Sequence, residues 1–129
     1  KMDIVTKKQI NILIQLAEAD KHFAKVEREM IYKIARERNF PEETVNDLIK
    51  NPEPIGSLGA LSNEQKFQYL HQCIELTFAD QKLFESELIF CRGIAIKLGF
   101  KKNVVDFMVA EKENMAREEL KARIFAEYT

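Results

Sequence analysis

The sequence is poor in residues that interrupt helices, with only four glycines and three prolines among 129 residues. Most of them fall within residues 51–59, Asn-Pro-Glu-Pro-Ile-Gly-Ser-Leu-Gly, which form the only obvious linker. No stretch alternates between apolar and polar residues for long enough to predict a β-strand. These absences favour helical structure on both sides of one central linker.

Cysteine and long apolar runs are also scarce. The two cysteines, Cys73 and Cys91, occupy apolar helix positions and form no zinc-type pattern with histidine. We expect them to be reduced core residues, although a pairing between them stays open. The apolar runs are only a few residues long, whereas a membrane-spanning helix needs about 20. We therefore expect no direct membrane insertion and, because no secretory signal pattern opens the chain, a cytoplasmic location.

Neither sign of charge dominates, since 20 Lys and Arg stand against 21 Asp and Glu for a net charge of −1. This balance lacks the basic footprint of a nucleic-acid-binding protein, so we expect no nucleic-acid partner. The signs are mixed along the chain, which excludes a charged tail or membrane patch. A 46% apolar fraction indicates a globular chain, and its length suits one domain over residues 1–129 without disulfide or metal staples.

Apolar residues recur at helical spacing on both sides of the linker. Ile10, Leu13, Ile14 and Ala17 follow the i, i+3, i+4, i+7 pattern. The same reasoning predicts six further helices: one ending near Asn39, one opening at Pro41, one starting at the Ser62–Gln65 capping box, one over about residues 84–98 before Gly99, one marked by residues 104–109 and a last one over residues 114–128.

A shift of 60 residues aligns the sequence with itself without a gap. Ala19-Asp20 then falls on Ala79-Asp80, Glu27 falls on Glu87, and Asn39 falls on Gly99. We therefore predict an all-α fold of about seven helices, in which two pseudo-symmetric three-helix halves (about residues 4–50 and 63–110) are followed by a C-terminal helix. Each half alone would leave an apolar face open, so the halves should pack about a rough two-fold axis.

Each half carries an Asp and a Glu seven residues apart at a helix–turn–helix corner. Asp20 and Asp80 stand at helix C-termini, where the helix dipole disfavours negative charge, whereas Glu27 and Glu87 stand in first helical turns, where it is favoured. One interpretation is structural: the acids cap backbone N–H groups. The other is a shared divalent-cation site, for which oxygen-only ligands suit Ca²⁺, Mg²⁺ or Mn²⁺, without EF-hand spacing.

The pattern Ala-Asp-x-x-apolar-x-x-x-Glu, followed by an apolar helix and an Asn-Phe or Gly-Phe end, occurs in both halves. It resembles the TerB-like family of tellurite-resistance proteins, which includes the N-terminal domain of certain membrane-anchored J-domain cochaperones. The resemblance implies a duplicated all-helical domain with a non-enzymatic role in a bacterial stress-response system. It also implies metal-binding acids and a protein partner that can be membrane-associated. Lys21 and Gln81 depart from the family pattern, since glycine usually follows the Asp.

Two other functions stay open beside a non-enzymatic binding or scaffold domain. They are a metal-dependent hydrolase and a purely structural interaction module in which the acids only cap helices. His22 could join Asp20 as a ligand or base, but a solvated histidine explains it better. His71 and Cys73 do not face each other on a helix, and no phosphate-binding glycine motif occurs. Basic residues at helix ends could form a further charged spot: Arg36, Arg38, Lys101 and Lys102. The partner and the oligomeric state cannot be read from these residues.

Overall fold

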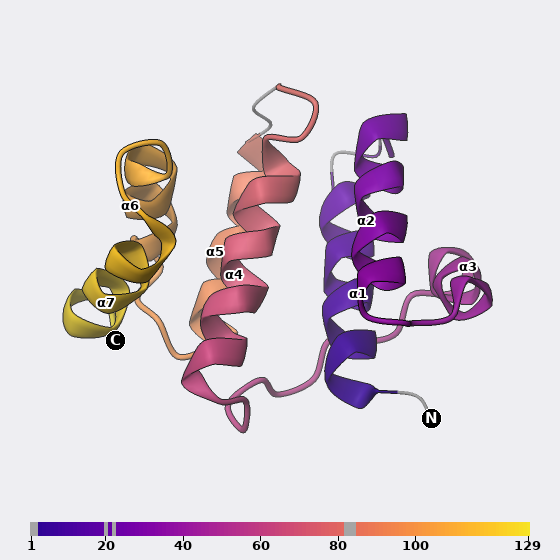
Figure 1. Cartoon of the computed structure of the whole chain (residues 1–129), viewed down its shortest axis with the longest axis horizontal. Helices are drawn as coiled ribbons and strands as arrows, with labels where there is room; N and C mark the ends of the chain where they lie inside the picture. The colour runs from indigo at the N-terminus through magenta and orange to yellow at the C-terminus, as the bar shows by residue number, and fades with distance from the viewer. Residues whose placement is uncertain (1–2, 20, 22, 82–84) are drawn as a thin grey trace.

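The computed structural model describes residues 3–19, 21, 23–81 and 85–129. Within these ranges the chain forms seven α-helices and no β-strand, which confirms the predicted all-α class (Figure 1). The helices are α1 (Ile4–Ala17), α2 (Lys25–Glu37), α3 (Glu42–Lys50), α4 (Asn63–Thr77), α5 (Glu85–Lys97), α6 (Val104–Glu111) and α7 (Arg117–Glu127).

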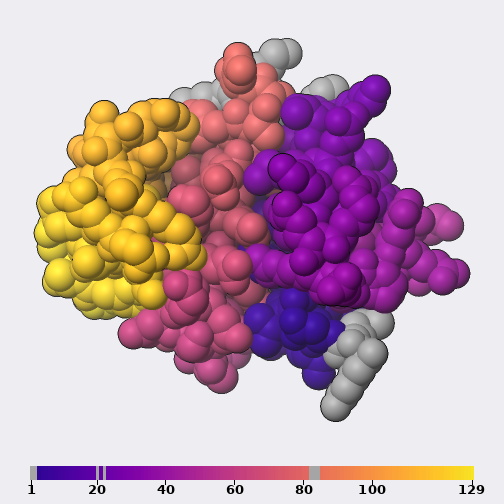
Figure 2. Space-filling view, in the orientation of Figure 1, coloured from indigo at the N-terminus to yellow at the C-terminus, as the bar shows by residue number. Residues whose placement is uncertain are grey.

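The same packing pattern occurs on both sides of the linker. Helix α1 contacts α2 and α3, and α4 contacts α5 and α6 in the same way. Helices α1 and α4 pack against each other and run in the same direction, so the two three-helix units join along their first helices (Figure 1). Helices α6 and α7 form one end of the molecule in the space-filling view (Figure 2).

The core is built from positions that the 60-residue shift pairs with each other. Leu16 of α1 and Leu76 of α4 are both fully buried, as are Ile31 of α2 and Cys91 of α5. Burying one such side chain contributes about 1.5–3 kcal/mol, so both first helices are central to stability. Cys91 therefore takes the place of a core isoleucine, as the sequence predicts.

Helices α2 and α5 end in the same way. Asn39 and Gly99 adopt left-handed conformations, with φ of 55° and 93°. The N–H groups of the following Phe40 and Phe100 donate to the carbonyls of Ala35 and Ala95, at 2.8 and 2.9 Å. This is the Schellman arrangement, and it confirms the helix ends predicted from the sequence.

The turns after α1 and α4 contain a left-handed residue at matching positions. Lys21 has φ of 63° and Gln81 has φ of 62°, at the positions where the resemblance expects glycine. A residue with a Cβ atom is strained in this conformation by about 1–2 kcal/mol, partly offset by the larger chain entropy that glycine loses.

We expect Gln81→Gly to raise the free energy of unfolding by about 0.5–1 kcal/mol, because glycine relieves the left-handed strain at little packing loss. Urea denaturation of the wild type, of this variant and of Gln81→Ala measures the effect. A Gly variant no more stable than the Ala variant would show that the turn is not strained.

One helix boundary differs from the sequence-based expectation. The last helix begins at Arg117, although the apolar spacing predicts a start at Asn114. The N–H groups of Asn114 and Met115 both donate to the Glu111 carbonyl, so the chain turns there after α6. Ala116 is then extended, with ψ of 154°, and it caps α7.

The linker lies on α1 and is held in place by side chains of α1. The Asn11 amide donates to the Glu53 carbonyl and accepts from the Glu53 N–H, both at 2.9 Å, and Gln15 donates to the same carbonyl at 2.6 Å. The Lys7 ammonium lies 3.0 Å from the Glu53 carboxylate. Leu58 is buried, so the linker is part of the packed structure.

We expect Asn11→Ala to destabilise the domain by about 1–3 kcal/mol, because it removes both hydrogen bonds to the Glu53 backbone. It should also make residues 51–62 the first site of limited proteolysis. His71→Ala, at the matching position of α4, is the control and should leave the linker protected. Equal cleavage of both variants would mean that Asn11 does not anchor the linker.

Candidate functional site

The helix ends that flank the two acidic corners lie at one end of the bundle. The C-termini of α1 and α4 and the N-termini of α2 and α5 all point toward this end (Figure 1). Asp80 lies partly buried just after α4, whereas Asp20 and the neighbouring His22 lie outside the described residues. Glu27 and Glu87 stand in the first turns of α2 and α5, as predicted, and are 1% and 0% exposed.

Glu27 makes a capping contact at the start of α2. Its Oε1 atom accepts the Ala24 N–H at 3.1 Å, which is the carboxylate half of a capping box. This contact agrees with the structural interpretation of the acids. Among the described residues no group of three or more His, Cys, Asp or Glu side chains converges to hold a metal ion. Because Asp20 is not described, the four-residue cation site of Asp20, Glu27, Asp80 and Glu87 stays a prediction.

A cavity of about 280 Å³ lies elsewhere, between α4 and the segment that runs from α6 into α7. Its apolar wall contains Ile74 and Met108, both buried, together with Phe78 and Leu120. Its polar groups come from both sides: His71 and Glu75 on α4, and Lys112 and Glu113 just after α6. A cavity in which an apolar wall meets several polar groups is a common form of a ligand site.

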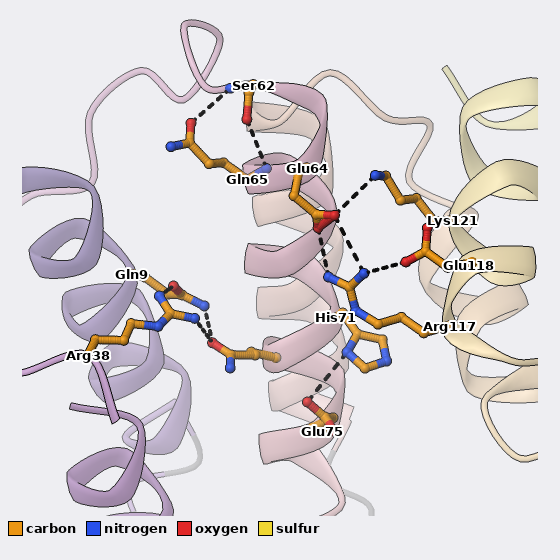
Figure 3. A network of polar contacts seen from close by, with 11 residues as sticks. Gln9, Arg38, Ser62, Glu64, Gln65, His71, Glu75, Arg117, Glu118 and Lys121 are labelled. Carbon is orange, nitrogen blue, oxygen red and sulfur yellow. Dashed lines mark hydrogen bonds and ion pairs between the residues drawn. The ribbon is translucent and has the colours of Figure 1, made fainter. Parts of the chain in front are cut away.

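The polar groups on the α4 side of the cavity form a pair. His71 Nδ1 lies 3.4 Å from Glu75 Oε1, and the imidazole lies on the side of α4 that faces α7 (Figure 3). The hydrogen bond from His71 is the largest influence on Glu75, and it lowers the pKa of this carboxyl below its ordinary value. Glu75 is therefore an ionised acceptor at neutral pH.

The opposite side of the cavity carries a cation. The Lys112 ammonium lies 4.6 Å from the centre of the Phe78 ring and 2.8 Å from Glu113 Oε1. An ammonium over an aromatic face is attracted by the ring, which keeps this cation at the apolar wall. The cavity thus presents a hydrogen-bond donor, Lys112, together with the acceptor Glu75. His71 has no histidine at the matching position of the other half. This difference between the halves is the one feature of the sequence that could have pointed to the site.

Helix α7 is fastened to the start of α4 beyond the cavity. The Glu64 carboxylate lies 2.7 Å from Arg117 and 3.1 Å from Lys121 (Figure 3). The Arg117 guanidinium also lies 4.8 Å from the centre of the Phe67 ring. The hydrogen bonds from Arg117 and Lys121 lower the pKa of Glu64 to about 2.

We expect Glu64→Gln to lower the melting temperature at pH 7 and to match the wild type at about pH 2. A carboxyl whose pKa is lowered by folding stabilises the fold at pH values above its unfolded-state pKa of 4.5. This stabilisation is lost as the pH falls through about 2, the pKa of Glu64 in the folded state. Because Glu64 is exposed, the difference should also shrink at high salt. Thermal melts over this pH range test it, with the exposed Glu119→Gln as control. A difference that persists at pH 2 would contradict the role of these ion pairs.

A partly buried polar cluster joins the two halves, and sequence reasoning missed it. Gln9 of α1 bonds to Gln72 of α4, and Arg38 bonds to both glutamines (Figure 3). Burial lowers the pKa of Arg38 below its ordinary value, but the charge is stabilised by glutamine oxygens. Arg38 therefore belongs to the interface between the halves, whereas the sequence groups it with the helix-end cations. The sequence held one indication of this cluster: the polar Gln9 stands four residues before Leu13, on an apolar stripe.

The two cysteines are free and buried, as the sequence predicts. Cys73 of α4 and Cys91 of α5 are hydrogen-bonded neighbours, and the Thr77 hydroxyl lies 3.6 Å from Cys91 Sγ. The bond to Cys91, together with burial, raises the pKa of the Cys73 thiol well above its ordinary value. This thiol is therefore protonated at neutral pH and is a weak nucleophile.

Comparisons with known proteins give no match: no family model, no curated protein and no solved structure is similar to this chain. The resemblance to TerB-like domains therefore depends on the corner residues alone and stays a prediction. Within the described part of the chain, no helix has both the length and the apolar character to cross a membrane.

Proposed function

We propose that this chain is a non-enzymatic binding domain that holds its ligand in the cavity between α4, α6 and α7. The observation that supports the proposal most directly is the cavity itself, where an apolar wall meets polar groups from α4 and from the turn after α6. The resemblance to TerB-like domains further supports a role as a scaffold in a bacterial stress-response system.

Site-specific photo-crosslinking in the cell that makes the protein tests this proposal. A photoreactive benzoylphenylalanine at Glu75, on the cavity, is compared with the same group at Glu37, an exposed residue at the end of α2. We expect a discrete adduct from position 75 and none from position 37. Adducts from neither position, or equal adducts from both, would contradict a ligand site at the cavity.

A second candidate function is divalent-cation binding at the acidic corners. The shared position of both corners at one end of the bundle supports it, as does the resemblance (Figure 1). A cation at 100 times its Kd should stabilise the fold by about 2.7 kcal/mol. Thermal unfolding with EDTA and then with Ca²⁺, Mg²⁺ or Mn²⁺ measures this in the wild type and in the double variant Asp20→Asn/Asp80→Asn. No shift with any of the three cations would leave the acids as helix caps.

A further inference from the structure

The internal repeat allows the cavity to be compared with the matching place in the other half. Under the 60-residue shift, His71 and Glu75 correspond to Asn11 and Gln15, and Glu113 corresponds to Glu53. In the first half these counterparts touch, since Asn11 makes two hydrogen bonds to the Glu53 backbone and Gln15 makes a third. In the second half the corresponding residues line opposite sides of the 280 Å³ cavity.

The difference follows from the segments that leave α3 and α6. After α3, residues 51–62 run along α1 without helical structure, and their backbone meets Asn11 and Gln15. After α6, the chain turns within residues 112–116 and enters α7, which is fastened to Glu64 at the start of α4. Non-helical backbone therefore covers this face of α1, whereas the same face of α4 borders the cavity.

The polar groups on α4 and after α6 keep the chemistry needed to hold a peptide backbone. An asparagine amide grips a peptide group because it both donates and accepts. In the second half these tasks fall to separate groups: with Nδ1 of His71 directed at Glu75, the Nε2 atom of His71 is left to bond to a peptide group. The Lys112 ammonium supplies a donor for a carbonyl, and the apolar wall accommodates an aliphatic side chain.

From this comparison we infer that the cavity binds an extended peptide segment of a partner protein, with one aliphatic side chain against Ile74 and Met108. The chain's own Glu53-Pro54-Ile55 segment on α1 is the internal precedent for holding a peptide backbone, and its half-buried Ile55 lines a small hollow with Ile12 and Leu58. The inference depends on the proposed function, because it names the kind of ligand that the same cavity takes.

Methyl NMR of the full chain with defined peptides tests the inference. The probes are acetylated, amidated Glu-Pro-Xaa-Gly-Ser peptides in which Xaa is Ile, Leu, Val, Asp or Lys. We expect the aliphatic peptides to shift the Ile74 and Met108 methyl signals and to leave Ile14 and Leu48, their repeat counterparts, unmoved. N-methylation of the Xaa amide, or the double variant His71→Ala/Lys112→Ala, should weaken binding about tenfold, since each removes hydrogen bonds to the backbone. An unchanged melting profile of the double variant confirms that it folds.

Two results would overturn the inference. If none of the peptides shifts the cavity methyls while 1-hexanol does, the cavity takes small apolar molecules, and the proposed binding function stands without its peptide ligand. If N-methylated peptides bind as well as the unmodified ones, the cavity recognises no backbone. The proposed binding function is tested by a separate experiment, because it fails if no crosslinks form at position 75.

Discussion

Leu16→Ala and Leu76→Ala are each expected to destabilise the domain by about 2–5 kcal/mol, the range for truncating a fully buried leucine. The two residues are repeat counterparts, both have 0% exposure, and they stand on α1 and α4, which pack against each other. Each truncation removes apolar contacts and leaves a cavity that a close-packed interior fills only in part. For a domain of this size the loss corresponds to a fall in melting temperature of roughly 10 °C or more.

The comparison between the two variants carries information beyond the size of the effect. If the halves share one core, both substitutions should lower stability in a single cooperative transition. Ile89→Ala is the matched control, because Ile89 is 59% exposed and its truncation should change stability by less than about 0.5 kcal/mol. Two separate transitions in either variant, or a cost below about 1 kcal/mol for one of them, would contradict a common core.

Glu27→Ala is expected to destabilise the domain by about 1–3 kcal/mol, whereas Glu27→Gln should lose less than about 1 kcal/mol. Glu27 is buried, and its Oε1 atom accepts the Ala24 N–H at the start of α2. Alanine removes this acceptor and leaves the N–H without its partner, while a glutamine oxygen can still accept it. Chemical denaturation with EDTA present gives both values free of any cation effect.

The same pair of substitutions, measured again with Ca²⁺, Mg²⁺ or Mn²⁺ in place of EDTA, separates the two interpretations of the acidic corners. A cap requires an oxygen acceptor, which glutamine keeps, whereas a hard divalent cation requires the charge, which glutamine lacks. If Glu27→Gln is as damaging as Glu27→Ala, the cap interpretation is wrong. Glu87 provides the parallel test at the start of α5, where it is also fully buried.

Much of the architecture could be predicted from the sequence because it depends on residues that are near each other along the chain. The spacing of Ile10, Leu13, Ile14 and Ala17 predicts α1, since a helix must turn its apolar residues to one side. Asn39 and Gly99 mark the ends of α2 and α5, because these residues tolerate the left-handed conformation of the C′ position. The 60-residue repeat predicts that both halves use the same turns, and the φ values of Lys21 and Gln81 agree.

The start of α7 was placed wrongly for a local reason as well. The apolar residues Leu120 and Ile124 fit a helix from Asn114, but spacing alone does not reveal that Asn114 and Met115 both bond back to Glu111. Their hydrogen bonds close a turn after α6, so α7 begins only at Arg117. Boundaries depend on such competing hydrogen bonds, whereas the existence of a helix depends on its whole periodic pattern.

By itself, the sequence determined the helical class, the duplication and the acidic pairs at the corners, because periodicity, capping residues and a repeat are properties of neighbours along the chain. Only the tertiary structure decided that Glu27 and Glu87 are buried, that Arg38 joins Gln9 and Gln72, and that His71 borders a cavity. The physical reason is that these properties depend on which surfaces meet across distant segments. Residues 51–62 run over α1 in the first half, whereas in the second half α7 is held on the start of α4. This difference leaves the cavity in the second half.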